Sequence, residues 1–257
     1  MRLFFCFLLF EWVIVSCNPK TNYMDPVARP DVILENTTSF SNYRQQYVRL
    51  YENFIGMDPA SNVITKNSFL KLLSTGEYLP LRMISKDSVT YYRLYKLDVS
   101  TSEEIRSTIK YWGLEEYDYH KMEGQELPDY SFEDMQGVIY NNQNTKGKIL
   151  VIKCWFLDCP PCVKEIPALN ELQQQYKNRS DIVFVSLCWD SRKDVEKFLN
   201  KTIFNYAVVP DQYKFLTERL QLNAYPTHFV INKQGIITKK TNEYGALAYA
   251  LRKESLR

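Results

Sequence analysis

Two cysteines separated by two prolines are the residues of this 257-residue chain best suited to chemistry. Cys159-Pro160-Pro161-Cys162 follows an apolar run, 148–156, that is typical of a strand, and precedes a pattern typical of a helix. At the start of a helix, backbone N–H groups and the helix dipole stabilise a thiolate. Thiol–disulfide exchange needs such a thiolate and a second thiol that displaces the captured substrate. We therefore predict that Cys159 attacks and that Cys162 resolves.

Other uses of a dithiol at this spacing need partners. A zinc site needs more ligands, but no second cysteine pair follows, and His120 and His228 lie far apart in the sequence. Haem attachment needs a histidine after the second cysteine, where Val163 stands. An inert buried disulfide remains an alternative. The strand–dithiol–helix context favours redox chemistry, and we expect neither a metal nor a cofactor.

Four segments of the C-terminal half carry a family pattern. Residues 155–167 contain the dithiol and Pro167, residues 223–235 contain Tyr225-Pro226-Thr227, and residues 124–130 and 134–137 precede both. The first segment resembles the active-site strand and helix of the thioredoxin superfamily, and the second resembles its cis-proline loop. Residues 124–130 and 134–137 resemble its N-terminal hairpin. Within it, the resemblance is to TlpA/ResA-like envelope thiol–disulfide oxidoreductases. It covers 119–257 and implies an α/β, thioredoxin-like fold with a central mixed sheet flanked by helices.

The hydrophobic pattern of the same region agrees with that fold. The continuous apolar run 181–189 predicts a strand buried on both faces. Helices are expected at 162–178, 191–200, 211–222 and 246–253, and two further strands at 227–232 and 236–240. Alternating strands and helices predict a right-handed parallel core with an antiparallel pair at its end.

The resemblance also implies which residues contact substrate. The bond before Pro226 is expected to be cis, and the backbone before it to pair with a substrate polypeptide as an added strand. Tyr225, Pro226, Thr227 and Trp155 are the predicted substrate contacts. An ordinary trans bond before a strand is the alternative.

Three charged residues near the dithiol could set its reactivity. Asp158 would disfavour the Cys159 thiolate if it lay close and poorly solvated. Lys153 would favour a thiolate or pair with Glu165 if it pointed inward, and would be a solvated strand charge if it pointed outward. Glu165 matches an acidic position that is thought to relay protons in ResA-like proteins, although a carboxylate in a first helical turn is favourable in any case.

The remaining cysteines have different roles. Cys154 and Cys188 lie on strands predicted to be neighbours and are interpreted as small buried hydrophobes, with a bridge between them as the alternative. Cys6 lies in the N-terminal apolar segment. That segment starts after Arg2 and ends in Ile14-Val15-Ser16-Cys17, which resembles a bacterial lipobox despite the interrupting Glu11-Trp12. Cys17 would then be lipidated; an uncleaved anchor or a plain secretory signal is the alternative.

These features divide the chain into four predicted parts. Residues 1–17 would be a lipoprotein signal peptide and 18–38 a polar tether, which predicts a lipid-anchored protein of the bacterial cell envelope, facing the periplasm or the outer surface. Residues 39–118 would form an accessory α+β region of open role. There we expect a helix ending at Gly56, a helix over 68–74, strands over 78–84 and 88–97, and a helix over 101–112 with a Thr101–Glu104 capping box and Gly113 at its end. Residues 119–257 would form the thioredoxin-like domain.

The predicted function is that of an enzyme: a thiol–disulfide oxidoreductase acting on cysteines of envelope proteins. The resemblance implies the reducing direction, with electrons from a membrane thiol carrier. A net charge of +2 and the lack of a basic stripe in the sequence argue against a nucleic-acid partner. Two alternatives remain. A peroxidase on this fold would need threonine where Phe156 stands, and a surface-anchored binding lipoprotein would carry a non-catalytic dithiol.

Overall fold

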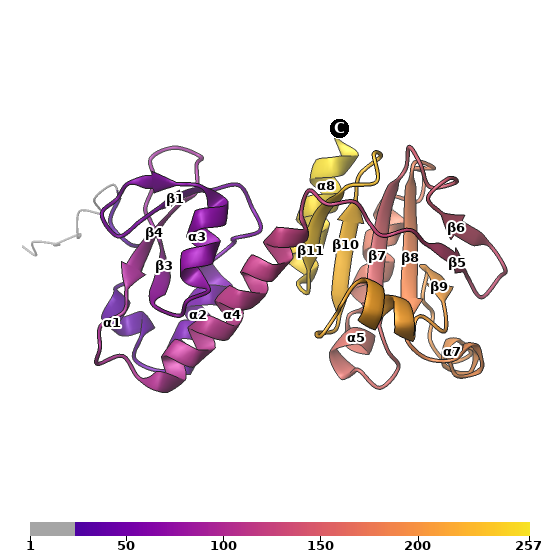
Figure 1. Ribbon diagram of the computed structural model, residues 1–257, viewed down its shortest axis with the longest axis horizontal. Coiled ribbons are helices and arrows are strands. Elements are labelled where there is room, and N and C mark those ends of the chain that lie inside the picture. Colours follow the sequence, from indigo (N-terminus) through magenta and orange to yellow (C-terminus); the bar gives the residue numbers. More distant parts are fainter. Residues whose placement is uncertain (1–23) are drawn as a thin grey trace, which may run out of the picture.

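The computed structural model describes residues 24–257, which form two lobes joined by one long helix (Figure 1). The predicted lipidation site Cys17 and the expected signal peptide lie outside the described residues. Between residues 24 and 257, no helix combines the length and the hydrophobicity that crossing a bilayer requires.

The N-terminal lobe is a small mixed sheet covered by helices, as the α+β prediction required. Its strands are β1 (Ile55–Met57), β2 (Val63–Ile64), β3 (Tyr78–Arg82) and β4 (Tyr91–Lys96), and its helices are α1 (Pro30–Ile33), α2 (Thr37–Tyr47), α3 (Lys66–Leu73) and α4 (Glu103–Met122). The strand order is β2-β1-β4-β3, with β1 parallel to β4 and the other pairs antiparallel. Phe40, Phe69 and Tyr92 are almost fully buried at its centre.

Part of the expected tether belongs to this lobe. Met24 N donates to the carbonyl of Ile84 at 3.0 Å, and Pro26 forms a bridge with Met83. Ile33 in α1 is 2% exposed. The tether prediction over 18–38 is therefore wrong for 24–38, because the apolar side chains among its polar residues find a core to bury in.

Two glycines that were predicted to end helices do not. Gly56 lies in β1, since α2 already ends at Tyr47, and Gly113 lies inside α4. A Cβ atom on Gly113 would lie 2.6 Å from the carbonyl oxygen of Leu73, so this glycine lets α4 approach α3 closely. The predicted capping box is also wrong, because Ser102 is the N-cap and accepts from Ile105 N at 3.4 Å.

The C-terminal lobe has a thioredoxin-like fold, as predicted. Its five-stranded sheet has the order β11-β10-β7-β8-β9, in which β7, β8 and β9 are parallel and β10 is antiparallel to both of its neighbours. The elements are β5 (Ser131–Glu133), β6 (Ile139–Asn141), β7 (Ile149–Trp155), α5 (Pro160–Lys164), α6 (Ile166–Gln175), β8 (Ile182–Cys188), α7 (Arg192–Leu199), β9 (Ala207–Val209), the π-helix η1 (Phe215–Arg219), β10 (Thr227–Ile231), β11 (Ile237–Thr241) and α8 (Tyr244–Ser255). The β5–β6 hairpin lies beside the sheet, and its two strands fall later in the chain than the respective segments, 124–130 and 134–137, that the resemblance assigned to a hairpin.

Both faces of the central strand β7 are covered. Ile149 and Val151 pack in one cluster with side chains of α6 and α8, whereas Leu150 and Ile152 pack in another with those of η1. Every residue of β7 is buried as a result. The helix predicted over 162–178 is divided into α5 and α6 at Glu165, two residues before Pro167, and the one predicted over 211–222 contains the short η1.

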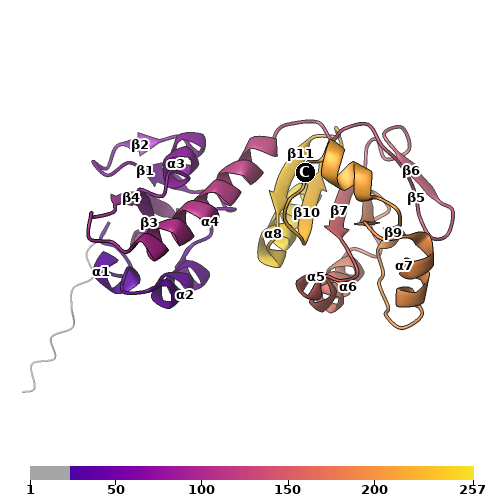
Figure 2. The same cartoon turned by 60° about the horizontal axis from the view of Figure 1, so that its bottom comes forward.

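Helix α4 connects the two lobes and contacts both (Figures 1 and 2). Near its C-terminal end, Asp118 pairs with Lys240 of β11 at 3.0 Å, and Glu123, directly after the helix, pairs with Lys239 at 2.6 Å. The expected boundary between residues 118 and 119 thus falls inside α4, which continues to Met122.

Candidate active site

The two cysteines lie where β7 passes into α5. Cys159 is the N-cap residue of α5, Pro160 occupies the first helical position, and the carbonyl of Cys159 accepts from Val163 N at 3.1 Å. Cys162 lies one turn further on and forms a disulfide with Cys159, with 5.2 Å between the Cα atoms. The dithiol therefore has the strand-to-helix position that the sequence predicted.

The two cysteines differ in their access to solvent. Cys159 retains 4% of its surface, whereas Cys162 has none. Both belong to a buried cluster with Trp155 and Ile166, against which Tyr225 packs. Of the two, Cys159 is thus the one that a reactant can reach, although less of it is exposed than an open groove would give. This asymmetry fits the predicted order of attack and resolution.

Next to the dithiol lies a group of contacting aromatic rings, here called the aromatic platform: Phe156, Trp189, Tyr213 and Tyr225. Successive ring centroids are 4.7–5.9 Å apart, and Trp189 and Tyr213 are 37% and 47% exposed. Tyr225 precedes Pro226 in a cis peptide bond, as the resemblance implied. Phe156 and Tyr225 pack against the cluster that contains both cysteines, so the platform connects that cluster to exposed apolar surface.

Two of the predicted substrate contacts, Trp155 and Thr227, have buried side chains. Trp155 is fully buried, and its Nε1 donates to Ser186 Oγ at 2.6 Å. Thr227 is 1% exposed, and its Oγ1 donates to the carbonyl of Ala224 at 2.8 Å. Both residues lie on strands of a sheet that is covered on both faces, so their side chains pack inside the protein and hold the neighbouring loops in place. Pro226 is buried as well.

Lys153 points inward, which settles the alternative that the sequence left open. Its side chain has no exposed surface, and its Nζ donates to the carbonyl of Cys162 at 2.9 Å and to the carboxylate of Glu165. Burial lowers the pKa of Lys153, an effect that the charge of Glu165 opposes. The lysine therefore links the turn that carries Cys162 to the acidic residue three positions later.

Glu165 has a second partner that sequence reasoning missed. His228 on β10 is fully buried, and its Nε2 lies 3.2 Å from Glu165 Oε2. Burial disfavours the carboxylate, but the hydrogen bond to His228 and the charge of Lys153 outweigh it, so the pKa of Glu165 lies below its ordinary value. Sequence analysis weighed His228 only as a zinc ligand. The feature that could have indicated its role is its position, two residues after the cis-proline on a strand of the core.

Among the described residues, Asp158 and the other two cysteines of the lobe form no hydrogen bond with this network, although Cys154 directly follows Lys153 on β7. Asp158 is exposed to solvent, where water and salt screen its charge. Cys154 and Cys188 are buried free thiols, as predicted, and burial raises the pKa of each well above that of an ordinary thiol. Neither is prepared to react at neutral pH.

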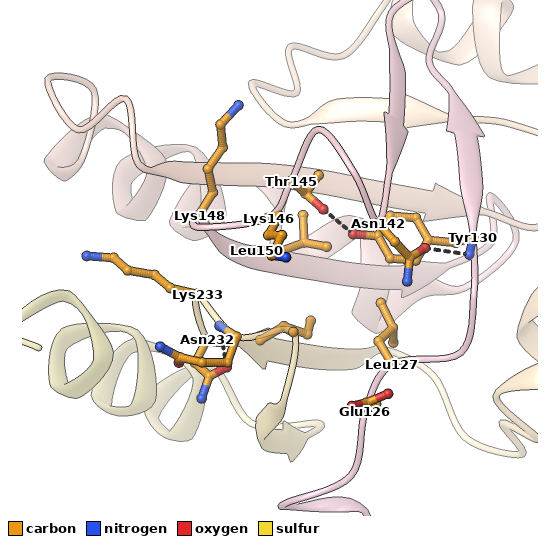
Figure 3. Close-up of a pocket in the computed structure, with 13 residues that line it drawn as sticks. Glu126, Leu127, Tyr130, Asn142, Thr145, Lys146, Lys148, Leu150, Asn232 and Lys233 are labelled. Atoms are coloured by element: carbon orange, nitrogen blue, oxygen red, sulfur yellow. Dashed lines mark hydrogen bonds between the residues drawn. The ribbon is translucent and has the colours of Figure 1, made fainter.

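A pocket of about 170 Å³ lies at the opposite end of β7 (Figure 3). Leu127, Tyr130 and Leu150 line it together with charged and amide side chains, and none of its lining residues is a cysteine or a histidine. Tyr130 bonds Thr145 through their hydroxyls, and Lys233 pairs with Asp181. The dithiol end of the sheet is therefore the better candidate for chemistry.

The sheet order, the disulfide at the start of α5 and the cis-proline loop define a thioredoxin-like domain. Residues 124–240 match the AhpC/TSA family.

Similar proteins carry names that agree with this class. The chain is 29% identical over 117 residues to the thioredoxin-like protein YneN of Bacillus subtilis, covering 45% of this chain and 68% of that protein. It is 27% identical over 124 residues to the thiol–disulfide oxidoreductase ResA of Bacillus anthracis, covering 48% and 72%. Among solved structures, a DsbE-type thiol:disulfide interchange protein assigned in Chlorobium tepidum shares 23% identity at a TM-score of 0.46, covering 52% and 95%.

Proposed function

We propose that this protein is a thiol–disulfide oxidoreductase that acts on cysteines of other proteins through Cys159 and Cys162. The observation that carries the proposal is the disulfide at the start of α5, of which only Cys159 reaches the surface, beside the cis-proline loop. The names of the similar proteins support the same activity.

The reduced dithiol would react with a substrate disulfide in two steps. The Cys159 thiolate attacks one substrate sulfur, the substrate S–S bond breaks, and the other substrate sulfur leaves as a thiolate that water protonates. Cys162 then loses its proton to Glu165 and attacks Cys159 Sγ, which breaks the mixed disulfide and releases the second substrate sulfur. Two electrons pass to the substrate, and the Cys159–Cys162 disulfide remains.

The aromatic platform is the proposed contact surface for the substrate chain. Tyr225 combines a place on the platform with the position directly before Pro226, where the backbone would pair with an extended substrate segment. Exposed aromatic rings beside the attacked cysteine favour substrates with apolar residues near their disulfide. Such a segment would remain in place while the mixed disulfide exists.

We further propose that the protein works as a reductase in the bacterial cell envelope. The resemblance to TlpA/ResA-like proteins supports the reducing direction and a membrane thiol carrier as electron donor. The segment ending in Cys17 supports a lipid anchor at the membrane. Cysteine-containing envelope proteins would be the substrates.

Reduction of insulin disulfides by the full chain, with dithiothreitol as the electron source, tests the activity. Cys159→Ser should abolish turnover, and Cys162→Ser should abolish it while trapping mixed disulfides. Cys154→Ser is the matched control, because this thiol is buried outside the dithiol, and it should keep the activity. An inactive parent protein would overturn the proposal. The redox potential tests the direction: we expect a value below about −200 mV, and a value near −120 mV would indicate an oxidase.

A further inference from the structure

Three ionisable side chains, here called the buried triad, form one hydrogen-bonded chain beneath the dithiol: Lys153, Glu165 and His228. They come from β7, from the junction of α5 and α6, and from β10, and they carry 0%, 14% and 0% of their side-chain surface exposed. Lys153 and His228 are direct neighbours in the β7–β10 register. Buried charges normally occur only where partners compensate them, so each member needs the others.

The surroundings of His228 determine its protonation. Nε2 faces the carboxylate of Glu165, whereas Nδ1 is buried and has no hydrogen-bond partner among the described residues. An imidazolium would bury a second N–H without an acceptor, and burial also lowers the pKa of His228. The neutral ring with hydrogen on Nε2 is therefore the form that fits, and it donates to Glu165.

The remaining groups that face the triad are uncharged. Tyr206, which precedes β9, is buried near Glu165 with its hydroxyl unpaired, and burial raises its pKa so that it keeps its proton. Tyr244 of α8 lies near Tyr206, and its pKa is also raised by burial. On the other side of β10, the residue of β11 opposite His228 is Thr241, which does not titrate. Within residues 24–257, Glu165 thus has Lys153 as its charged partner and His228 as its neutral donor.

This arrangement suits the removal of a proton from Cys162. Cys162 is fully buried, and burial opposes the formation of a thiolate there. Lys153 binds both the carbonyl of Cys162 and the carboxylate of Glu165. If the proton moves from Cys162 to Glu165, the negative charge moves from the carboxylate to the sulfur and stays near the same ammonium group. The buried site therefore remains neutral overall through the transfer.

We propose that His228 is a positioning residue for the resolving step: its Nε2–H holds the Glu165 carboxylate ionised and oriented as the proton acceptor for Cys162. This rests on the proposed function. His228 does not touch the substrate or the reacting sulfur atoms; it acts through Glu165. Cys159 attacks from the surface side, so its reaction does not depend on His228.

Two amide substitutions separate the donor role from a merely structural one. In His228→Gln the side-chain nitrogen lies as many bonds from Cα as Nε2 does, so it can donate to Glu165. In His228→Asn the nitrogen corresponds to Nδ1 and falls short. Both variants are uncharged, polar and unable to titrate near neutral pH. The two variants are therefore matched in charge, polarity and titration, and they differ in how far the side-chain nitrogen extends from Cα.

The experiment mixes the reduced full chain with dithiobis-nitrobenzoate in a stopped-flow instrument across a pH series. The first coloured thiolate reports attack by Cys159, and the second reports attack by Cys162 on the mixed disulfide. His228→Asn should slow the second phase about ten-fold at pH 7. The midpoint of the plot of second-phase rate against pH should move up by about one unit. His228→Gln should match the parent in both phases, and the first phase should stay the same in all three proteins.

The outcomes distinguish this inference from the proposed function. A parent protein that shows no second phase overturns the proposed function itself. A normal parent with an unchanged second phase in His228→Asn overturns only the role of His228, as does an equal loss in both variants, which would indicate a requirement for the ring alone. Should His228→Asn not fold, His228→Gln still decides, because a ten-fold slower second phase in that variant contradicts the inference.

Discussion

Replacing Lys153 with methionine removes a buried charge while keeping a long unbranched side chain. Glu165 would lose its cationic partner, and the carbonyl of Cys162 would lose a hydrogen bond. Removing one member of a buried ion pair typically costs about 3–5 kcal/mol, because the other charge remains buried and uncompensated. Because His228 still donates one hydrogen bond to Glu165, we expect a loss at the low end of this range. The free energy of unfolding should fall by about 3 kcal/mol at pH 7.

The cost should depend on pH in a defined direction. In the parent, the pKa of Glu165 is held below its ordinary value, so its contribution to stability is full at neutral pH and is lost as pH falls through that lowered pKa. In Lys153→Met, burial no longer meets an opposing charge and raises the pKa of Glu165. The carboxyl group then takes up a proton as pH falls from 7 towards about 4, which removes the uncompensated charge. The gap in stability between the two proteins should therefore narrow on acidification.

Urea unfolding of the oxidised full chain, followed by tryptophan fluorescence at pH 7 and pH 4, measures this gap. The control is the double variant Lys153→Met/Glu165→Leu, which buries no unpaired charge and should recover most of the lost stability. A single variant that costs less than about 1 kcal/mol at pH 7, or a cost equal at both pH values, would refute the assignment of Lys153 as the partner that stabilises Glu165.

Three further predictions concern other parts of the molecule. Gly113→Ala should lower the free energy of unfolding by about 1–3 kcal/mol in urea, because its Cβ would lie 2.6 Å from the Leu73 carbonyl oxygen, whereas Gly245→Ala, which meets only ordinary contacts, should be neutral or slightly stabilising. Burial lowers the pKa of Lys66 to about 8, so the free energy of unfolding of the parent should rise with pH between about 8 and 10.5. Lys66→Met should remove this rise and should stabilise the protein at pH 7 by about 1–3 kcal/mol. Tyr225→Ala should raise the KM for insulin several-fold while leaving the reaction with dithiobis-nitrobenzoate within about two-fold; equal losses on both substrates would contradict a role in binding the protein chain.

The sequence predicted the C-terminal fold well because its signals are local. An apolar run of strand length and two prolines between cysteines each constrain a few neighbouring residues, so these elements can be located without knowing the order β11-β10-β7-β8-β9 of the sheet. The role of Gly113 was beyond such reasoning. A glycine that ends a helix and one that admits a neighbouring helix look alike until the partner, here Leu73, is known. Residues 24–38 were misread for the same reason, since a polar stretch shows its few buried side chains only against their core.

Whether Lys153 points inward could not be decided from alternation along its strand, because alternation assumes that one face of the strand meets solvent. Strand β7 is the central strand of five, with helices on both faces, so neither direction leads to water. Once the strand order is known, a lysine at this position must be buried and must have an anion. The α5–α6 junction supplies Glu165, and the antiparallel register of β10 brings His228 opposite the lysine. The buried triad therefore follows from topology rather than from any local motif, and it is the part of the site that only the assembled sheet reveals.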